Sequence, residues 1–179
     1  MNIHILSPFS RTKDLAKAYN DSIKHLPAED WICLMDYDAM FLLPEQINRM
    51  YDYVAAYPDT ALFVCYGSRC KDGIAQQYKG GTCENDSIQD QIQNAKVMLQ
   101  HSIMATPVLR SVAGFLMLFS KATWEKHKFI EGVSKCLKVD TAFSKGILRT
   151  GGKILLMESI YIWHSYRLME GKQSIKHLL

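Results

Sequence analysis

The chain has 179 residues, which suits a single domain over residues 1–179. Hydrophobic residues make up 48% of the chain and charged residues 22%, and this composition excludes a disordered chain, a collagen and a coiled-coil rod. The net charge of +3 is too small to indicate nucleic acid binding, so no nucleic acid partner is expected.

No segment has the pattern of a membrane anchor or a signal peptide. The longest strictly apolar run, Val112–Phe119, is far shorter than the ~18 residues of a transmembrane helix, and the N-terminus lacks a basic region. Cys33 and Cys65 lie inside apolar runs, which favours reduced core thiols and a cytoplasmic protein. Lys172 and Lys176 leave open a peripheral contact with a membrane.

Strand and helix patterns alternate in the first third of the chain. Strands are expected at Asn2–Ser7 and Trp31–Met35. Between them, an apolar stripe at helical spacing predicts a helix that Ser10 or Thr12 caps and Pro27 ends. The stripe consists of Leu15, Tyr19, Ile23 and Leu26.

A second helix and a third strand follow. Pro44 suits the first helical position, and apolar residues recur at helical spacing behind it. Ala61–Tyr66 is continuously apolar, which is typical of a strand buried on both faces. The order β-α-β-α-β predicts an α/β fold whose mostly parallel sheet carries helices on its faces.

The middle of the chain begins with a long loop at residues 67–86, which has little apolar periodicity. Ser87 then opens a helix, with Asp90 as its capping-box partner. Val112–Phe119 is expected to be a strand, and Gly114 inside it indicates close approach by a ligand or another backbone segment.

Short helices and strands are also expected in the last third of the chain. A helix is expected to be capped by Asp140 or Thr141 and to end at Gly151 and Gly152. The remaining expected elements are a short helix at Ser120–Lys128, strands at Lys153–Met157 and Ser159–Trp163, and a helix in the tail at Tyr166–Leu179.

Two carboxylates follow the strand at Trp31–Met35 directly. Ligands in open α/β sheets collect beyond the carboxyl ends of strands, where Asp36 and Asp38 are expected. Neighbouring carboxylates repel each other unless a cation lies between them, and a hard divalent ion with oxygen ligands fits that position. The alternative is an ordinary turn with solvated aspartates.

Two further residues carry candidate chemistry. His164 ends an apolar run, where it is a metal ligand, a general base or an ordinary polar residue. Asp140 is expected at a helix start, where a carboxylate either caps the helix or acts as a general base on a hydroxyl within reach.

In this order, the segments resemble the GT-A glycosyltransferases, and most closely their family 2 type. Asp36-Tyr37-Asp38 resembles the D-x-D motif, and Val139–Phe143 resembles the E-D-x-D-L segment that includes the catalytic base. Trp163-His164 is similar to the later histidine of the metal site. Further similar segments are the helix Leu15–Asn20 and the acceptor-side strand Val112–Phe119.

This resemblance implies a GT-A, Rossmann-like nucleotide-diphospho-sugar transferase with a mixed, mostly parallel sheet. Asp38 and His164 would ligate Mn²⁺ or Mg²⁺, and Asp36 would contact the ribose or reach the metal through water. Asp140 would deprotonate the acceptor hydroxyl, which implies inversion. The donor would be a nucleotide-diphospho sugar, with a UDP-sugar favoured, and the acceptor a carbohydrate, lipid or protein hydroxyl.

The chain departs from the family pattern at the nucleotide end. Only one helix separates the first strand from Asp36, and the acidic residue that reads the base in the family has no counterpart. Ser7, Pro8 and Phe9 are expected to pack against the base instead, and Arg167 to reach a phosphate. Val139 and Ala142 stand where the family carries acids.

Several residues have two interpretations. Arg69, Lys71 and Lys79 either touch the donor diphosphate or are solvated loop cations. Tyr78 and Trp124 are candidates for stacking on sugars, and Trp124 is alternatively a core residue. Two alternative functions remain at this point. One is a non-catalytic nucleotide- or carbohydrate-binding GT-A relative, and the other is a metal-dependent nucleotidyltransferase in which Asp140 is only a cap.

Overall fold

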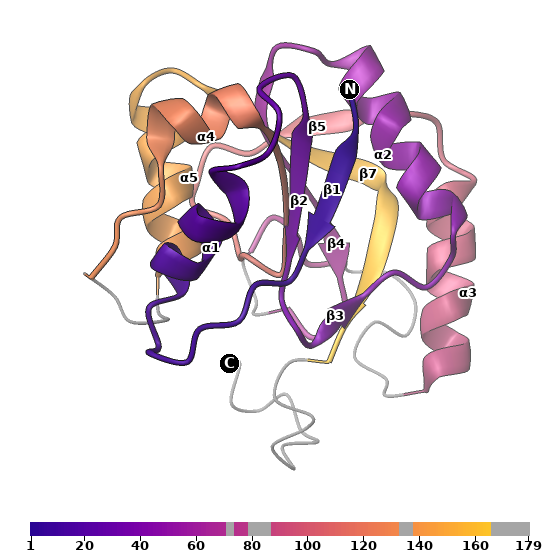
Figure 1. Ribbon diagram of the computed structural model, residues 1–179. Helices are drawn as coiled ribbons and strands as arrows, with labels where there is room; N and C mark the ends of the chain where they lie inside the picture. The colour runs from indigo at the N-terminus through magenta and orange to yellow at the C-terminus, as the bar shows by residue number, and fades with distance from the viewer. Residues whose placement is uncertain (71–73, 79–86, 133–137, 166–179) are drawn as a thin grey trace.

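The computed structural model describes residues 1–70, 74–78, 87–132 and 138–165 (Figure 1). The expected helix in the tail lies outside these residues. The strands are β1 (Ile3–Leu6), β2 (Trp31–Met35), β3 (Ala39–Met40), β4 (Thr60–Gly67), β5 (Ala105–Pro107), β6 (Leu116–Ser120) and β7 (Lys153–His164). The helices are α1 (Leu15–Ile23), α2 (Glu45–Ala56), α3 (Ile88–Leu99), α4 (Lys121–His127) and α5 (Val139–Arg149).

The described strands form one sheet in the order β1-β2-β6-β4-β7-β3, with β5 paired to β7. Helices α1, α4 and α5 lie on one face of the sheet, and α2 and α3 lie on the other (Figure 1). The expected α/β fold, with a mixed sheet flanked by helices, is therefore confirmed.

Fewer of the strand pairs are parallel than the sequence predicts. β1 pairs with β2 and β4 with β7 in parallel. The pairs β2–β6, β4–β6, β3–β7 and β5–β7 are antiparallel. β6 inserts between β2 and β4, and the short strands β3 and β5 had no pattern in the sequence. A mostly parallel GT-A arrangement thus stays a prediction.

The core has two halves because the central strands are buried on both faces. All of β2 is buried, and its side chains alternate between the two halves. Ile32 and Leu34 pack with residues of α1, α4 and α5. Trp31, Cys33 and Met35 pack with residues of α2. Cys33 and Cys65 are buried free thiols, as their apolar surroundings indicated.

Two helix starts differ from those that the sequence predicts. Asp14, rather than Ser10 or Thr12, caps α1 by accepting the Lys17 backbone N–H at 3.0 Å. At α5 the N-cap position is Lys138, in the left-handed conformation with φ +65°, so the prediction of Asp140 or Thr141 as the cap is wrong.

The start of α3 and the end of α5 agree with the sequence pattern. The Ser87 side chain accepts the Asp90 backbone N–H at 3.4 Å, as expected for the cap of α3. Gly151 follows α5 with φ +77°, a conformation that glycine adopts without a steric penalty.

Two expected strand boundaries are also wrong. β6 begins at Leu116, so Gly114 lies in a turn before the strand rather than inside it. The two strands expected around Glu158 are one strand, β7, whose pairing with β4 shifts register between Met157 and Tyr161. Beyond the shift, Trp163 and His164 at the end of β7 pair with β3 in antiparallel fashion.

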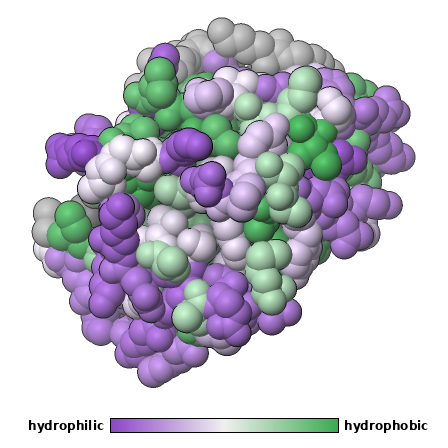
Figure 2. All heavy atoms as spheres, turned by 90° about the horizontal axis from the view of Figure 1, so that it is seen from above, coloured by the Kyte–Doolittle hydropathy of each residue, from purple (hydrophilic) through white to green (hydrophobic). Residues whose placement is uncertain are grey.

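The outer surface mixes polar and apolar side chains. Figure 2 shows the face that is uppermost in Figure 1, where hydrophilic and hydrophobic side chains lie in small interspersed groups. Scattered apolar residues of this kind are ordinary on protein surfaces. Among the described residues, no helix combines the length and the apolarity needed to cross a bilayer.

Candidate metal and substrate site

Asp36 and Asp38 lie in the turn between β2 and β3. The Asp36 backbone N–H donates to the Phe115 carbonyl at 3.2 Å, and the Ala39 N–H donates to the Asp36 carbonyl at 3.1 Å. These bonds fix the turn at the carboxyl end of β2, where the sequence predicts the two carboxylates. Both side chains are partly buried.

The end of β7 brings His164 to Asp38. Ala39 pairs with His164 across the β3–β7 ladder, and Ser165 donates its backbone N–H and its hydroxyl to the Asp38 carbonyl at 2.8 and 3.0 Å. The Nε2 atom of His164 lies 3.7 Å from Oδ1 of Asp38. Two segments far apart in the sequence therefore meet at this point.

His164 is held in place by two neighbours. Its ring stacks on Phe115 with the ring centroids 4.8 Å apart, and its backbone N–H donates to the Ser68 hydroxyl at 2.8 Å. The Ser68 hydroxyl in turn donates to the His164 carbonyl at 3.0 Å. Because Phe115 also accepts the Asp36 N–H, one buried aromatic residue connects the histidine to the first aspartate.

The ionisation of these side chains is shifted by burial. Burial, together with the neighbouring charges of Asp38 and Asp140, raises the pKa of Asp36 to about 6. Burial lowers the pKa of His164, although the charge of Asp38 opposes this effect. The histidine is therefore neutral at pH 7, with a nitrogen lone pair available to a ligand.

The three side chains suit a divalent ion. One ligand atom each from Asp36, Asp38 and His164 lies within 4.8 Å of the others. Two atoms on opposite sides of an ion with bonds of about 2.1 Å lie about 4 Å apart, so small side-chain rotations complete the geometry. Two carboxylates and one neutral imidazole match the preferences of Mn²⁺, and Mg²⁺ also accepts the carboxylates.

A cavity of about 190 Å³ adjoins this cluster and joins it to Asp140. Asp36 and Asp140 both line it, together with Leu15, Tyr19, Gly114, Lys138 and Val139. Asp36 thus belongs to both the metal cluster and the cavity, whereas Asp38 and His164 are not among the residues that line it.

Asp140 lies in the first turn of α5 with its carboxylate fixed. Its Oδ1 accepts the Thr141 backbone N–H at 2.7 Å, and the backbone of Gly114 also hydrogen-bonds to the carboxylate. Burial nevertheless raises the pKa of Asp140, and these hydrogen bonds only partly offset that effect. A carboxylate with a raised pKa is a stronger proton acceptor once it is ionised.

The residues expected at the nucleotide are not all brought to the cluster. Ser7 and Pro8 follow β1, which runs parallel to β2, so they lie at the same end of the sheet as Asp36. Among the described residues, no hydrogen bond or ion pair is seen between them and the cluster. Arg167 lies outside the described residues.

Three of the five remaining candidates, Arg69, Tyr78 and Trp124, lie within the described part of the chain. Arg69 is buried, with 1% of its surface exposed, so its interpretation as a solvated loop cation is wrong. Trp124 is a core residue, and Tyr78 packs edge-on against Tyr66 and Tyr161. Lys71 and Lys79 lie outside the described residues.

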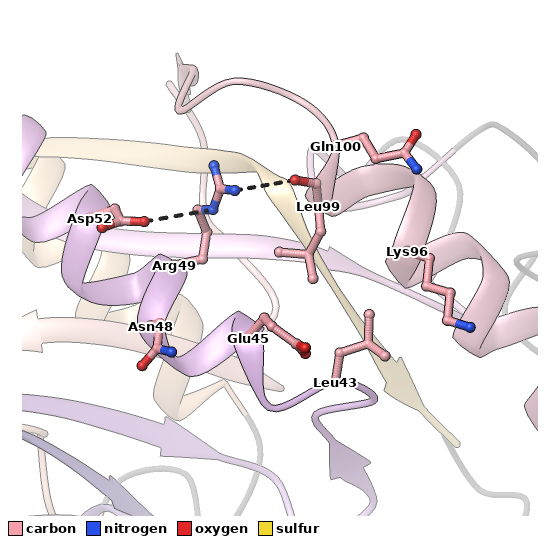
Figure 3. Close-up of a pocket in the computed structure, with 8 residues that line it drawn as sticks. All are labelled: Leu43, Glu45, Asn48, Arg49, Asp52, Lys96, Leu99 and Gln100. Carbon is pink, nitrogen blue, oxygen red and sulfur yellow. Dashed lines mark hydrogen bonds and ion pairs between the residues drawn. The ribbon is translucent and has the colours of Figure 1, made fainter.

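A larger cavity of about 590 Å³ lies between α2 and α3, away from these residues (Figure 3). Arg49 crosses it, donating to the Leu99 carbonyl at 3.2 Å and facing Asp52 at 3.8 Å. None of the candidate catalytic residues lines it. Arg49 is thus engaged with Asp52 and with the end of α3.

Sequence reasoning did not identify three residues that shape the site. Phe115 and Ser68 hold His164, and the Gln76 side chain bonds both the N–H and the carbonyl of Ala113, beside Gly114. Phe115 has an ordinary core pattern, and Ser68 and Gln76 lie in a segment without periodicity. Their positions depend on contacts between distant segments, which local patterns do not carry.

Comparison with known proteins adds no assignment: no protein-family model matches the sequence, and the search of curated proteins gives no match.

Proposed function

We propose that the protein is a metal-dependent glycosyltransferase that moves a sugar from a nucleotide-diphospho sugar, with a UDP-sugar favoured, to an acceptor hydroxyl. The observation that carries the proposal is the position of Asp36. It belongs to the Asp36/Asp38/His164 cluster and lines the cavity that contains Asp140. The candidate cation site and the cavity of the candidate proton acceptor therefore have Asp36 in common.

In this proposal, Asp38 and His164 hold the divalent ion, and Asp36 binds it directly or through water. When bound, the ion supplies positive charge that stabilises the departing nucleoside diphosphate. The neutral state of His164 supports this role because a protonated imidazole has no lone pair to offer.

Asp140 acts as the general base. The acceptor oxygen forms a bond to the anomeric carbon while the bond from that carbon to the phosphate oxygen breaks. The electron pair leaves with the nucleoside diphosphate, and the hydroxyl proton passes to the Asp140 carboxylate. A single displacement of this kind inverts the anomeric configuration. The bonds from Thr141 and Gly114 support the role by fixing the carboxylate at the cavity wall.

Product analysis tests the proposal. The protein is incubated with a panel of UDP- and GDP-sugars and Mn²⁺, and in parallel with nucleoside triphosphates and sugar 1-phosphates. Free nucleoside diphosphate in the first mixture, lost with EDTA and in the Asp38→Asn variant, is the expected result. Pyrophosphate in the second mixture indicates nucleotidyl transfer instead. Nucleotide binding without either product indicates a non-catalytic binding protein.

A further inference from the structure

A second cavity lies along α5 and adjoins the cavity of Asp140. It has a volume of about 370 Å³, within the range of small-molecule sites. The two cavities share Lys138 and Val139 as lining residues. The two cavities therefore border each other at the start of α5, and we name the second one the α5 pocket.

The α5 pocket is lined by cations. Lys145 and Arg149 lie four residues apart on one face of α5, Lys138 lines the pocket from the N-cap position, and all three are exposed. None of the described residues that line the pocket is acidic. Arginine and lysine in this arrangement suit a phosphate or carboxylate group, which arginine binds through two parallel hydrogen bonds.

The pocket also has apolar walls. Val139 and Ala142 face it from α5, and Ile130 lines it from the segment after α4. Ile130 is 61% exposed, which is unusual for a large aliphatic side chain next to three cations. Apolar walls beside cations favour a ligand that joins an anionic group to a small apolar part.

The position of the α5 pocket favours binding of the acceptor over binding of the donor. Asp38 and His164, which would hold the ion at the donor diphosphate, line neither cavity. The cations lie on the side of Asp140, where the acceptor hydroxyl has to be. We propose, on the basis of the proposed function, that the acceptor is a small molecule bearing a phosphate or carboxylate group, and that this group binds Lys138, Lys145 and Arg149 in the α5 pocket.

Calorimetric titration of the full chain with phenyl phosphate tests this proposal. The titration is done in EDTA, so that the metal site does not contribute, and at physiological ionic strength. The expected result is saturable binding that the double variant Lys145→Gln, Arg149→Gln weakens by at least about tenfold. The matched control is Lys96→Gln, Lys153→Gln, which removes the same charge from exposed lysines outside the pocket and is expected to change binding less than about twofold.

Three further titrations separate the sources of binding. Benzyl alcohol has the apolar ring without the anion and is expected not to bind. Benzoate distinguishes a carboxylate ligand from a phosphate ligand. Vesicles of phosphatidylglycerol test a membrane surface, and binding to vesicles without binding of either small anion contradicts the proposal.

Two other results also contradict it. One is that neither anion binds, and the other is that both double variants lose the same amount of affinity for phenyl phosphate.

The binding experiment can fail or succeed separately from the test of the proposed function. A protein that binds phenyl phosphate in EDTA but releases no nucleoside diphosphate from any donor contradicts the transfer reaction and keeps the anion site. A protein that releases nucleoside diphosphate but binds neither anion contradicts only the α5 pocket.

Discussion

Gly114 and Asp140 are in contact in a way that leaves no room for a side chain at position 114. A Cβ atom added to Gly114 would lie 2.8 Å from the Cβ of Asp140 and 3.3 Å from its Oδ2. The Gly114 backbone also hydrogen-bonds to the Asp140 carboxylate. The close approach at this glycine is made by the side chain of Asp140 and not by the ligand or backbone segment that the sequence predicts, and the turn before β6 sets the position of the proposed base.

Gly114→Ala is expected to displace Asp140 and to lower turnover by roughly tenfold to a hundredfold, because small misplacements of reacting groups are costly. The overpacking is also expected to lower the free energy of unfolding by roughly 1–3 kcal/mol. Steady-state kinetics and denaturant unfolding measure the two effects.

Gly146→Ala, on the helix that carries Asp140, is the matched control for Gly114→Ala. A Cβ there would meet only Nδ1 of His127, at 3.9 Å. Replacing a glycine inside a helix is expected to raise stability by about 1 kcal/mol and to leave turnover unchanged. If Gly114→Ala keeps full turnover, Asp140 is not the base at the position that the structure gives it.

Asp36 is expected to make the metal-free protein less stable as the pH rises. Its pKa is raised from 3.8 to about 6, so the folded state favours the protonated form. The resulting stabilisation is present below pH 3.8 and is lost as the pH rises through 6, by about 3 kcal/mol at most. In EDTA, Asp36→Asn is expected to unfold at a higher temperature than wild type at pH 7.5 and at the same temperature near pH 4.

Asp59→Asn is the control for Asp36→Asn, since it removes an exposed carboxylate in the turn between α2 and β4. It is expected to shift the unfolding temperature little at either pH. Equal behaviour of the two variants from pH 4 to 7.5 would contradict the raised pKa of Asp36.

Mn²⁺ binding is expected to need both Asp38 and His164. Each of the variants Asp38→Asn and His164→Gln removes one ligand and is expected to weaken Mn²⁺ by at least about tenfold, measured by calorimetry at pH 7. Because the ion competes with the proton on Asp36, affinity is expected to fall below about pH 6. Unchanged affinity in both variants places the ion elsewhere.

Asp140→Asn keeps the size of the side chain but removes the proton acceptor. Turnover is expected to fall by at least about a hundredfold, while donor binding with Mn²⁺ stays within about twofold of wild type. In wild type, turnover is expected to rise with pH through the raised pKa of Asp140. A variant with normal turnover makes Asp140 a structural residue of α5.

The parts of the fold that local patterns determine were predictable from the sequence. β2 and α3 match their expected positions because an apolar run and a capping serine specify them directly. β3 and β5 have two and three residues and form by pairing with β7, so no periodicity reveals them. The start of α5 was missed because Lys138 adopts a left-handed conformation, which residue type alone does not predict.

The candidate site was predictable only in part. Asp36 and Asp38 follow a strand, so their position at its end was a local inference. The proximity of His164 depends on the register shift in β7 and on the pairing of Ala39 with His164, which are long-range features. Only the resemblance to a known family linked the histidine to the aspartates. Lys138, which lies between the two cavities, had no signal at all.

A thermal-shift titration tests the central claim most directly. The protein is heated with UDP, GDP and UDP-sugars, each with Mn²⁺ and with EDTA, alongside Asp38→Asn. The account predicts stabilisation that needs both a nucleotide and Mn²⁺ and is lost in the variant, with about 2.7 kcal/mol expected at a hundredfold the dissociation constant. The absence of a shift with every nucleotide in Mn²⁺, or the same shift in EDTA, would contradict a metal-dependent donor site at Asp36, Asp38 and His164.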